Sequence, residues 1–151
     1  MLEHTHALLR HAGAQEVIVS GDRPAFDGVP DMQSDTGPMG ALAQLVPRLQ
    51  DGIWLVVPVD MPLLSPALIR TLVSADASCA CVEDHMLPMA LRVDDGGRAA
   101  IDEVGRRAGR ERSLRALQQR LRTLVLPSMP WRDALRNCNT PDDWAALREM
   151  P

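Results

Sequence analysis

The fold of this chain is decided by the stretch Ile53-Trp54-Leu55-Val56-Val57-Pro58-Val59-Asp60-Met61-Pro62. Its first five residues form a continuous apolar run, which is typical of a strand buried on both faces of a parallel sheet. Asp60 follows directly, between two prolines that restrict the backbone. Ligands of open α/β sheets bind beyond the carboxyl ends of strands, where a carboxylate can hold a hard cation such as Mg²⁺. Asp60 is therefore a candidate metal ligand, although a cap of the following turn explains it equally well.

Helix and strand patterns alternate on both sides of this stretch. Helices are predicted over residues 2–11, 38–49, 65–74 and 99–122 (interrupted near Gly109) and from Thr140 onward. Further strands are predicted over residues 16–20, 77–83, 88–93 and 124–126. The alternation predicts an α/β fold with a mostly parallel sheet and helices on both faces. We expect residues 1–151 to form one domain.

Composition excludes several classes of function. Sixteen basic against twenty acidic residues give a net charge of −4, which argues against nucleic-acid binding. All basic residues are arginine, so no lysine serves as a phosphate ligand or Schiff base. The cysteines, Cys79, Cys81 and Cys138, form no C-x-x-C pair, which favours the reducing cytoplasm. The longest apolar stretch, residues 53–59, is too short to cross a membrane.

Two other motifs are candidate binding segments. Gly37-Pro38-Met39-Gly40 opens a predicted helix, where free N–H groups favour anions, but it is also an ordinary loop-to-helix junction. Asn137 and Asn139 alternate, so both amides would point to one side of an extended segment. Thr140 as the N-cap and Asp143 three residues later explain the end of that motif by helix capping alone.

A third candidate is a run of seven arginines between Arg106 and Arg122. Such a run is usually the solvated face of a helix. The alternative is an electropositive wall that binds phosphates.

Six segments in this order resemble the molybdenum cofactor guanylyltransferases, within the wider sugar-nucleotide-transferase-like family. They are V-I-V-S-G (17–21), G-P-M-G-A-L (37–42), V-V-P-V-D-M-P-L-L (56–64), H-M-L-P-M-A-L (85–91), R-S-L-R-A-L (112–117) and N-C-N-T-P-D-D (137–143). The resemblance implies a three-layer αβα Rossmann-like nucleotidyltransferase fold. It also implies transfer of GMP from GTP to molybdopterin with Mg²⁺, releasing pyrophosphate.

The resemblance also implies a role for each matching residue. Asp60 is the counterpart of the magnesium-binding, catalytic aspartate. The residues expected near the nucleotide are Ser20, Asp31, Gly37, Pro38 and Gly40. Asn137 and Asn139 match paired asparagines that bind substrate at the edge of the active site.

The chain departs from the family at its first residues. Family members begin with a strand and a glycine-rich L-A-G-G-x-S-x-R-M-G loop, whereas this chain begins at Met1-Leu2-Glu3-His4, where the family is in its first helix. The expected sheet therefore lacks that strand. Either residues 16–20 pair directly with residues 53–57, or a second copy of the chain or a partner protein covers the edge. Two functions stay open: an enzyme whose start lies upstream or whose loop a partner supplies, and a catalytically degenerate relative that binds nucleotide, cofactor or a partner.

Overall fold

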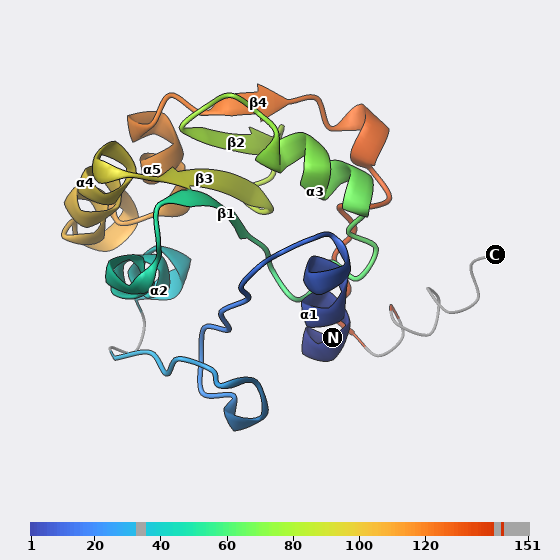
Figure 1. The fold of residues 1–151 in the computed structure, drawn as a ribbon. Coiled ribbons are helices and arrows are strands. Elements are labelled where there is room, and N and C mark those ends of the chain that lie inside the picture. The colour runs from blue at the N-terminus through green and yellow to red at the C-terminus, as the bar shows by residue number, and fades with distance from the viewer. Residues whose placement is uncertain (33–35, 141–142, 144–151) are drawn as a thin grey trace.

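The computed structural model describes residues 1–32, 36–140 and 143, and its centre is a mixed sheet of order β1-β3-β2-β4 (Figure 1). The strands are β1 (Gly52–Val56), β2 (Cys79–Val82), β3 (Met89–Val93) and β4 (Leu124–Leu126). The helices are α1 (Leu2–His11), α2 (Gly37–Leu45), α3 (Pro66–Val73), α4 (Asp95–Gly105) and α5 (Leu114–Arg120). Short 3₁₀ turns span Pro24–Phe26, Val46–Arg48, Gly109–Glu111 and Met129–Trp131.

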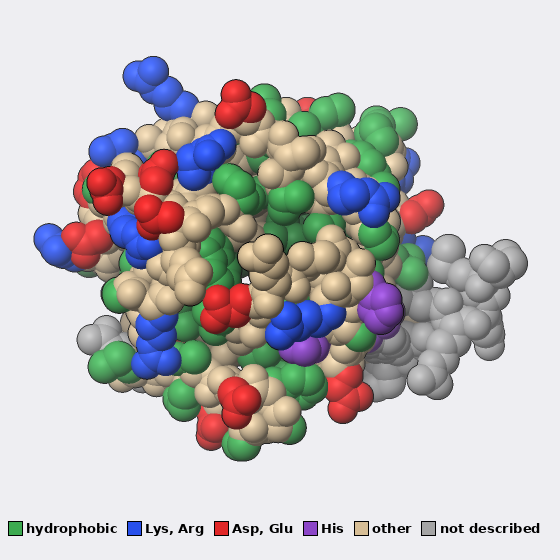
Figure 2. Space-filling view, viewed as in Figure 1, with side chains coloured by type: hydrophobic (Ala, Val, Ile, Leu, Met, Phe, Trp, Pro, Cys, Tyr) green, Lys and Arg blue, Asp and Glu red, His purple; other side chains and the backbone are tan. Residues whose placement is uncertain are grey.

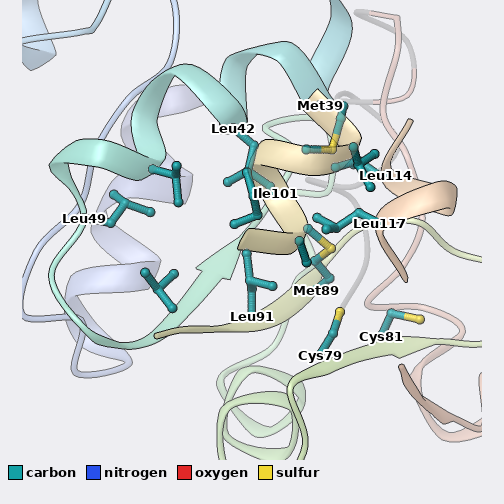
Figure 3. Close-up of a cluster of buried hydrophobic side chains, with 14 residues drawn as sticks. Met39, Leu42, Leu49, Cys79, Cys81, Met89, Leu91, Ile101, Leu114 and Leu117 are labelled. Atoms are coloured by element: carbon teal, nitrogen blue, oxygen red, sulfur yellow. The ribbon is translucent and has the colours of Figure 1, made fainter. Parts of the chain in front are cut away.

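Helices cover both faces of the sheet (Figure 1). Side chains alternate along each strand, so that Cys79 and Cys81 of β2 face one core while Ala80 and Val82 face the other. The first core contains residues of α2, α4 and α5, including the fully buried Ile101 and Leu117 (Figure 3). The second core contains residues of α1 and α3. The predicted α/β fold with helices on both faces is confirmed.

The sheet is mixed rather than mostly parallel. β3 pairs antiparallel with both β1 and β2, and only the β2–β4 pair is parallel among the described strands. The reason is the short connection between β2 and β3, because a parallel pair needs a crossover of a dozen or more residues. Every strand still ends or begins near the same few loops, and these loops form the site described below.

The strand predicted over residues 16–20 does not form. Within the described residues this segment makes one isolated parallel bridge, between Ser20 and Val29. Direct pairing with β1 is therefore wrong, and β1 pairs with β3 alone in the described part of the chain. Val17 and Ile18 nevertheless pack against the two opposite cores, as side chains of a strand would. The apolar pattern is strand-like, but among the described residues the segment has a β-bridge neighbour only at Ser20, where the Val29 N–H donates to the Val19 carbonyl at 2.8 Å.

The predicted helices agree better with the structure. The helix over residues 2–11 is confirmed, and Ser65 caps α3 by accepting a hydrogen bond from the N–H of Leu68 at 3.2 Å. The helical region predicted over residues 99–122 is divided into α4 and α5 by the turn at Gly109–Glu111. The helix predicted from Thr140 lies mostly outside the described residues.

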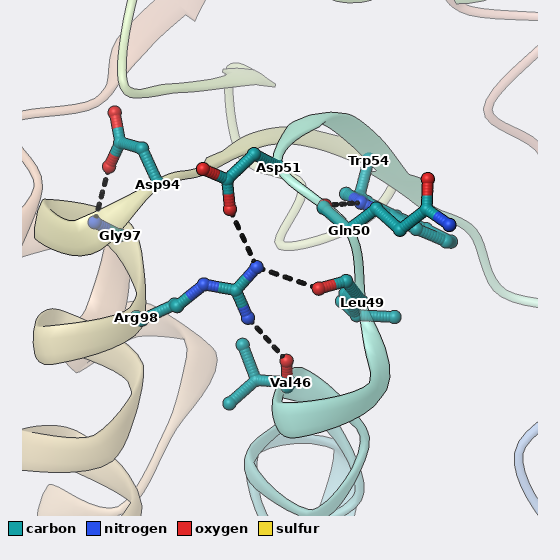
Figure 4. A network of polar contacts seen from close by, with 8 residues as sticks. All are labelled: Val46, Leu49, Gln50, Asp51, Trp54, Asp94, Gly97 and Arg98. Carbon is teal, nitrogen blue, oxygen red and sulfur yellow. Dashed lines mark hydrogen bonds and ion pairs between the residues drawn. The ribbon is translucent and has the colours of Figure 1, made fainter.

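Arg98 joins α4 to the end of the α2 region (Figure 4). Its guanidinium donates to the carbonyls of Val46 and Leu49 at 2.8 and 2.7 Å, and to a carboxylate oxygen of Asp51 at 2.8 Å. These carbonyls lie at the end of a helical segment, where the Val46 carbonyl also accepts from the Leu49 N–H at 3.2 Å and the Leu49 carbonyl has no partner within the helix. One side chain thus connects three successive parts of the chain that leads into β1.

Replacing Arg98 with Met should lower the free energy of unfolding by about 2 kcal/mol, because Met keeps the aliphatic length but leaves these acceptors without their charged donor. Arg106→Met is a matched control in the same helix, where the 78% exposed side chain pairs with Asp102 one turn away. We expect less than about 0.5 kcal/mol from that change. Urea denaturation of both variants measures the difference, and equal losses would contradict the prediction.

All three cysteines are free thiols in the core. Burial raises the pKa of Cys79 to about 11 from an ordinary value of 9.0. Because all three thiols are buried, none of them should react with Ellman's reagent at pH 8 until the chain is unfolded in guanidinium chloride. Cys79 loses its proton at a lower pH in the unfolded chain than in the folded chain. The free energy of unfolding should therefore fall as pH rises from about 9 to 11. Rapid labelling of a thiol in the folded chain would contradict this.

The surface carries no concentrated charge on the side shown in Figure 2, where acidic and basic side chains are interspersed. Several arginines of the run between Arg106 and Arg122 pair locally with acids, as Arg107 and Arg120 do with Glu103. No helix in the described part of the chain is long and apolar enough to cross a membrane.

Candidate active site

One end of the sheet gathers the loops that could bind a ligand. The last residue of β1, Val56, lies opposite the first residue of β3, Met89. Cys81 near the end of β2 also pairs with Met89, and Val82 pairs with Leu126 at the end of β4. The turn after β1 and the turn between β2 and β3 therefore meet at the same edge of the sheet.

A cavity of about 630 Å³ opens at this edge. Its walls come from the start of α2, the turn after β1, the β2–β3 turn, the start of α5 and Asn137. Polar, charged and glycine residues in these walls include Gly37, Asp60, Asp84, His85, Arg112, Arg115 and Asn137. Segments that are far apart in the sequence thus form a single concave surface.

Asp60 is half-buried and lines this cavity. The backbone around it is held from two sides: the Cys138 N–H donates to the Asp60 carbonyl at 2.7 Å, and His4 of α1 donates from Nε2 to the Pro62 carbonyl at 2.8 Å. No hydrogen bond or ion pair within the described residues engages the Asp60 carboxylate. A half-buried carboxylate without a partner, on a backbone that is held in place, is suited to a cation or a ligand donor.

Three other residues expected from the sequence lie at the same cavity: Gly37, Pro38 and Asn137. Gly37 begins α2 with φ +63°, a conformation that favours glycine. Pro38 follows it at the start of the helix, where a missing N–H costs nothing. The backbone preferences of Gly37 and Pro38 therefore explain the start of α2, and the same residues also form part of the cavity wall.

Four of the expected residues lie elsewhere: Ser20, Asp31, Gly40 and Asn139. Ser20 and Asp31 are exposed, in the segment before α2. A Cβ on Gly40 would collide with the Thr36 side chain, so the missing side chain at this position serves close packing. The structure brings neither Asn139 nor the other three to the cavity.

The Asn139 region is organised by capping. Asp143 accepts hydrogen bonds from the N–H groups of Asn139 and Thr140 at 3.0 and 2.8 Å, and its own N–H donates to Thr140 Oγ1 at 3.1 Å. These bonds hold the pKa of the Asp143 carboxyl below its ordinary value, with the Thr140 side chain contributing most. The alternative that explains this motif by capping is thus supported for Thr140 and Asp143.

Two pairs of cavity residues were not predicted individually from the sequence, which indicated the first pair only as members of the arginine run. Arg112 and Arg115 belong to the arginine run, and neither guanidinium makes a hydrogen bond or ion pair within the described part of the chain. Asp84 and His85 lie in the β2–β3 turn. The available signal was the position of these residues at the ends of predicted elements, but only the strand order shows that these ends meet.

The donors present fit a magnesium ion that a ligand helps to hold. No group of three or more His, Cys, Asp or Glu residues in the described ranges could bind a metal alone. Mg²⁺ usually takes one or two carboxylates and completes its shell with water and phosphate oxygens. The unpartnered Asp60 carboxylate, in a cavity large enough for a phosphate ligand, meets that requirement.

Comparison with known proteins decides the family. The family model described as the MobA-like NTP transferase domain matches residues 1–124. The chain belongs to this family. It is also 46% identical over 150 residues to a molybdenum cofactor guanylyltransferase of Xanthomonas euvesicatoria pv. vesicatoria (strain 85-10), covering 97% of this chain and 79% of that protein.

Solved structures agree on the fold. Molybdopterin-guanine dinucleotide biosynthesis protein A from Archaeoglobus fulgidus matches with a TM-score of 0.68 and 19% identity, over 97% of this chain and 84% of that one. A protein from Aquifex aeolicus VF5 matches with a TM-score of 0.67 and 17% identity, over 92% and 82% of the two chains. At these identities the likeness concerns the fold alone.

Proposed function

We propose that this family member transfers GMP from GTP to molybdopterin, releasing pyrophosphate, and that it uses Mg²⁺ to do so. The observation that carries the proposal is the unpartnered Asp60 carboxylate at the end of β1, in a cavity that also exposes two unpaired arginines. The 46% identical guanylyltransferase supports the choice of substrates.

Asp60 would hold the ion, which when bound neutralises charge on the nucleotide phosphates. Gly37, with its positive φ and no side chain, lets the backbone at the start of α2 approach those phosphates closely. The free guanidiniums of Arg112 and Arg115 suit a second anionic group, because arginine binds phosphate through paired donors. Asn137, exposed at the rim, offers an amide to either substrate. Catalysis then consists mainly of positioning and charge stabilisation.

The test begins with binding. Isothermal titration of the full chain with GTP should show affinity that depends on Mg²⁺, and CTP serves as the matched nucleotide. Incubation with GTP, Mg²⁺ and molybdopterin should then yield the guanine dinucleotide and pyrophosphate, detected by mass spectrometry. Absence of Mg²⁺-dependent GTP binding would overturn the proposal.

Binding without transfer would also overturn it, in favour of a degenerate relative that holds nucleotide or cofactor without turnover. One other route is that a partner supplies the family's glycine-rich loop. Transfer that starts only when a peptide with this loop is added would distinguish that route from a degenerate relative. We further propose that the chain acts in the cytoplasm, where free thiols such as its three buried cysteines persist.

A further inference from the structure

The cavity has two ends that lie on different strands. Asp60 follows β1, whereas His85 lies in the turn that follows β2. β3 separates these strands in the sheet, so the two strands that lead into these turns lie about 10 Å apart, twice the spacing of neighbouring strands. The two turns thus offer separate contacts, one at Asp60 and Gly37 for the nucleotide of the proposed function and one at His85 for a second ligand.

The turn that carries His85 is held firmly. The His85 N–H donates to the Val82 carbonyl at 3.0 Å, and the Glu83 N–H donates to the Leu126 carbonyl at 2.8 Å. Gln118 of α5, a buried residue, donates from Nε2 to the Met86 carbonyl at 3.0 Å. Both β4 and α5 thus fix the position of this turn, and the half-buried imidazole is held with it.

The hydrogen bonding of the ring determines what it can offer. Nδ1 of His85 lies 2.9 Å from the Glu83 carbonyl oxygen. A carbonyl only accepts, so Nδ1 carries a proton, and in the tautomer protonated at Nδ1 alone Nε2 is an acceptor. Nothing in the described ranges hydrogen-bonds Nε2. In this tautomer the second end of the cavity contains a hydrogen-bond acceptor at a held position.

The charged groups around this acceptor restrict the ligand. Arg112 and Arg115 approach the cavity from the start of α5, and Asp84 and Asp60 line it from the two turns. The arginines donate only and suit an anionic group. A ligand that combines a phosphate with an N–H or O–H donor matches both features.

We propose that His85 Nε2 accepts a hydrogen bond from an N–H or O–H group of the acceptor substrate and so contributes to its selection. This role rests on the proposed transferase function, because it assigns one end of the cavity to the acceptor and the other to the nucleotide. The acceptor it fits is a phosphorylated heterocycle with a donor group on its ring.

Two variants separate this role from a structural one. His85→Asn places an amide near the position of Nδ1, where it can still donate to the Glu83 carbonyl, but removes the acceptor at Nε2. His85→Gln instead places an amide oxygen near the position of Nε2. If the role of His85 is purely structural, the Asn variant should resemble the native chain more closely. If His85 hydrogen-bonds the acceptor substrate, the Gln variant should resemble it more closely.

The experiment measures the KM for molybdopterin and the KM for GTP in the full chain with Mg²⁺. We expect His85→Asn to raise the KM for molybdopterin about tenfold with the KM for GTP unchanged, since one hydrogen bond is lost. His85→Gln should stay within about threefold of the native value for both substrates, a partial rescue. An unchanged molybdopterin KM in His85→Asn, or equal losses in the two variants, would overturn the role of His85.

Failure of the proposed function looks different. A native chain that forms no dinucleotide although it binds GTP with Mg²⁺ overturns the transferase proposal and the role of His85 together. If the native chain is active and His85→Asn has the same KM for molybdopterin, the role of His85 is overturned and the transferase function stands.

Discussion

Asp60→Asn should abolish the Mg²⁺-dependent part of GTP binding and lower the rate of guanylyl transfer roughly 10³-fold, about 4 kcal/mol in the barrier. The change preserves shape and removes the charge of a carboxylate that no hydrogen bond or ion pair in the described residues engages. The melting temperature should stay within about 1 °C of the native value, because no folded-state bond of the side chain is lost. Titration with GTP, with and without Mg²⁺, measures the first effect.

A matched control removes the same charge at the opposite end of the sheet. Asp76 precedes β2 and is fully exposed, with a loose 3.6 Å pair to Arg92. Asp76→Asn should leave GTP affinity within about twofold of native, since a solvated charge far from the cavity is screened. Equal losses in both variants would mean that net charge, rather than a ligand at the end of β1, governs binding. Unchanged Mg²⁺-dependent affinity in Asp60→Asn would remove Asp60 from the site.

The part of the site that could be predicted is the part that local sequence determines. An apolar run followed by Pro58-Val59-Asp60 places a carboxylate just beyond the end of a strand, whatever the strand's neighbours are. The expectation that this strand is buried on both faces is wrong, because β1 lies at the edge of the sheet and none of its residues is fully buried. Gly37 and Pro38 likewise mark the start of α2 through backbone preferences alone. These residues lie at the cavity because the ends of their elements meet there.

The direction of the strands was also available in the sequence. Only residues 83–88 separate β2 from β3, which is too short for a parallel crossover and is typical of an antiparallel hairpin. The alternation of helix and strand elsewhere favoured a parallel sheet and outweighed this local signal. Applying the length of each connection to each pair would have predicted the mixed sheet.

Other features depend on contacts that no local pattern reveals. Residues 16–20 have the composition of a strand, but a strand also needs a hydrogen-bonding neighbour, which this segment has only at Ser20. His85 and Arg112 reach the cavity because β2 lies two positions from β1 and because α5 begins at the same edge. That order is a property of the whole sheet, so neither residue could be placed from its own segment.

Gly97→Ala should lower the free energy of unfolding by about 3 kcal/mol and the melting temperature by roughly 6–12 °C. Gly97 is buried in the first turn of α4, where its N–H donates to the capping carboxylate of Asp94 at 2.8 Å. A Cβ at this position would collide with the carbonyl oxygen of Arg92 at the end of β3. A backbone carbonyl cannot turn aside as a flexible side chain does, so α4 would have to move.

The neighbouring glycine supplies the control. A Cβ on Gly96, which is exposed in the same turn, would meet only one oxygen of Asp94 at 3.4 Å, an ordinary contact. Gly96→Ala should therefore raise the free energy of unfolding by about 0.5–1 kcal/mol, because alanine favours the helix and restricts the unfolded chain. Thermal and urea denaturation of the two variants should shift in opposite directions, and shifts of the same sign would contradict the steric argument.

The collision also has a consequence at the cavity. α4 packs closely on α2, since a Cβ on Gly105 would lie 2.8 Å from that of Ala43, and α2 begins at Gly37 in the cavity wall. A displaced α4 therefore shifts the start of α2, and Gly97→Ala should weaken Mg²⁺-dependent GTP binding even below its melting transition. Native-like GTP affinity in the folded variant would show that the start of α2 is positioned independently of α4.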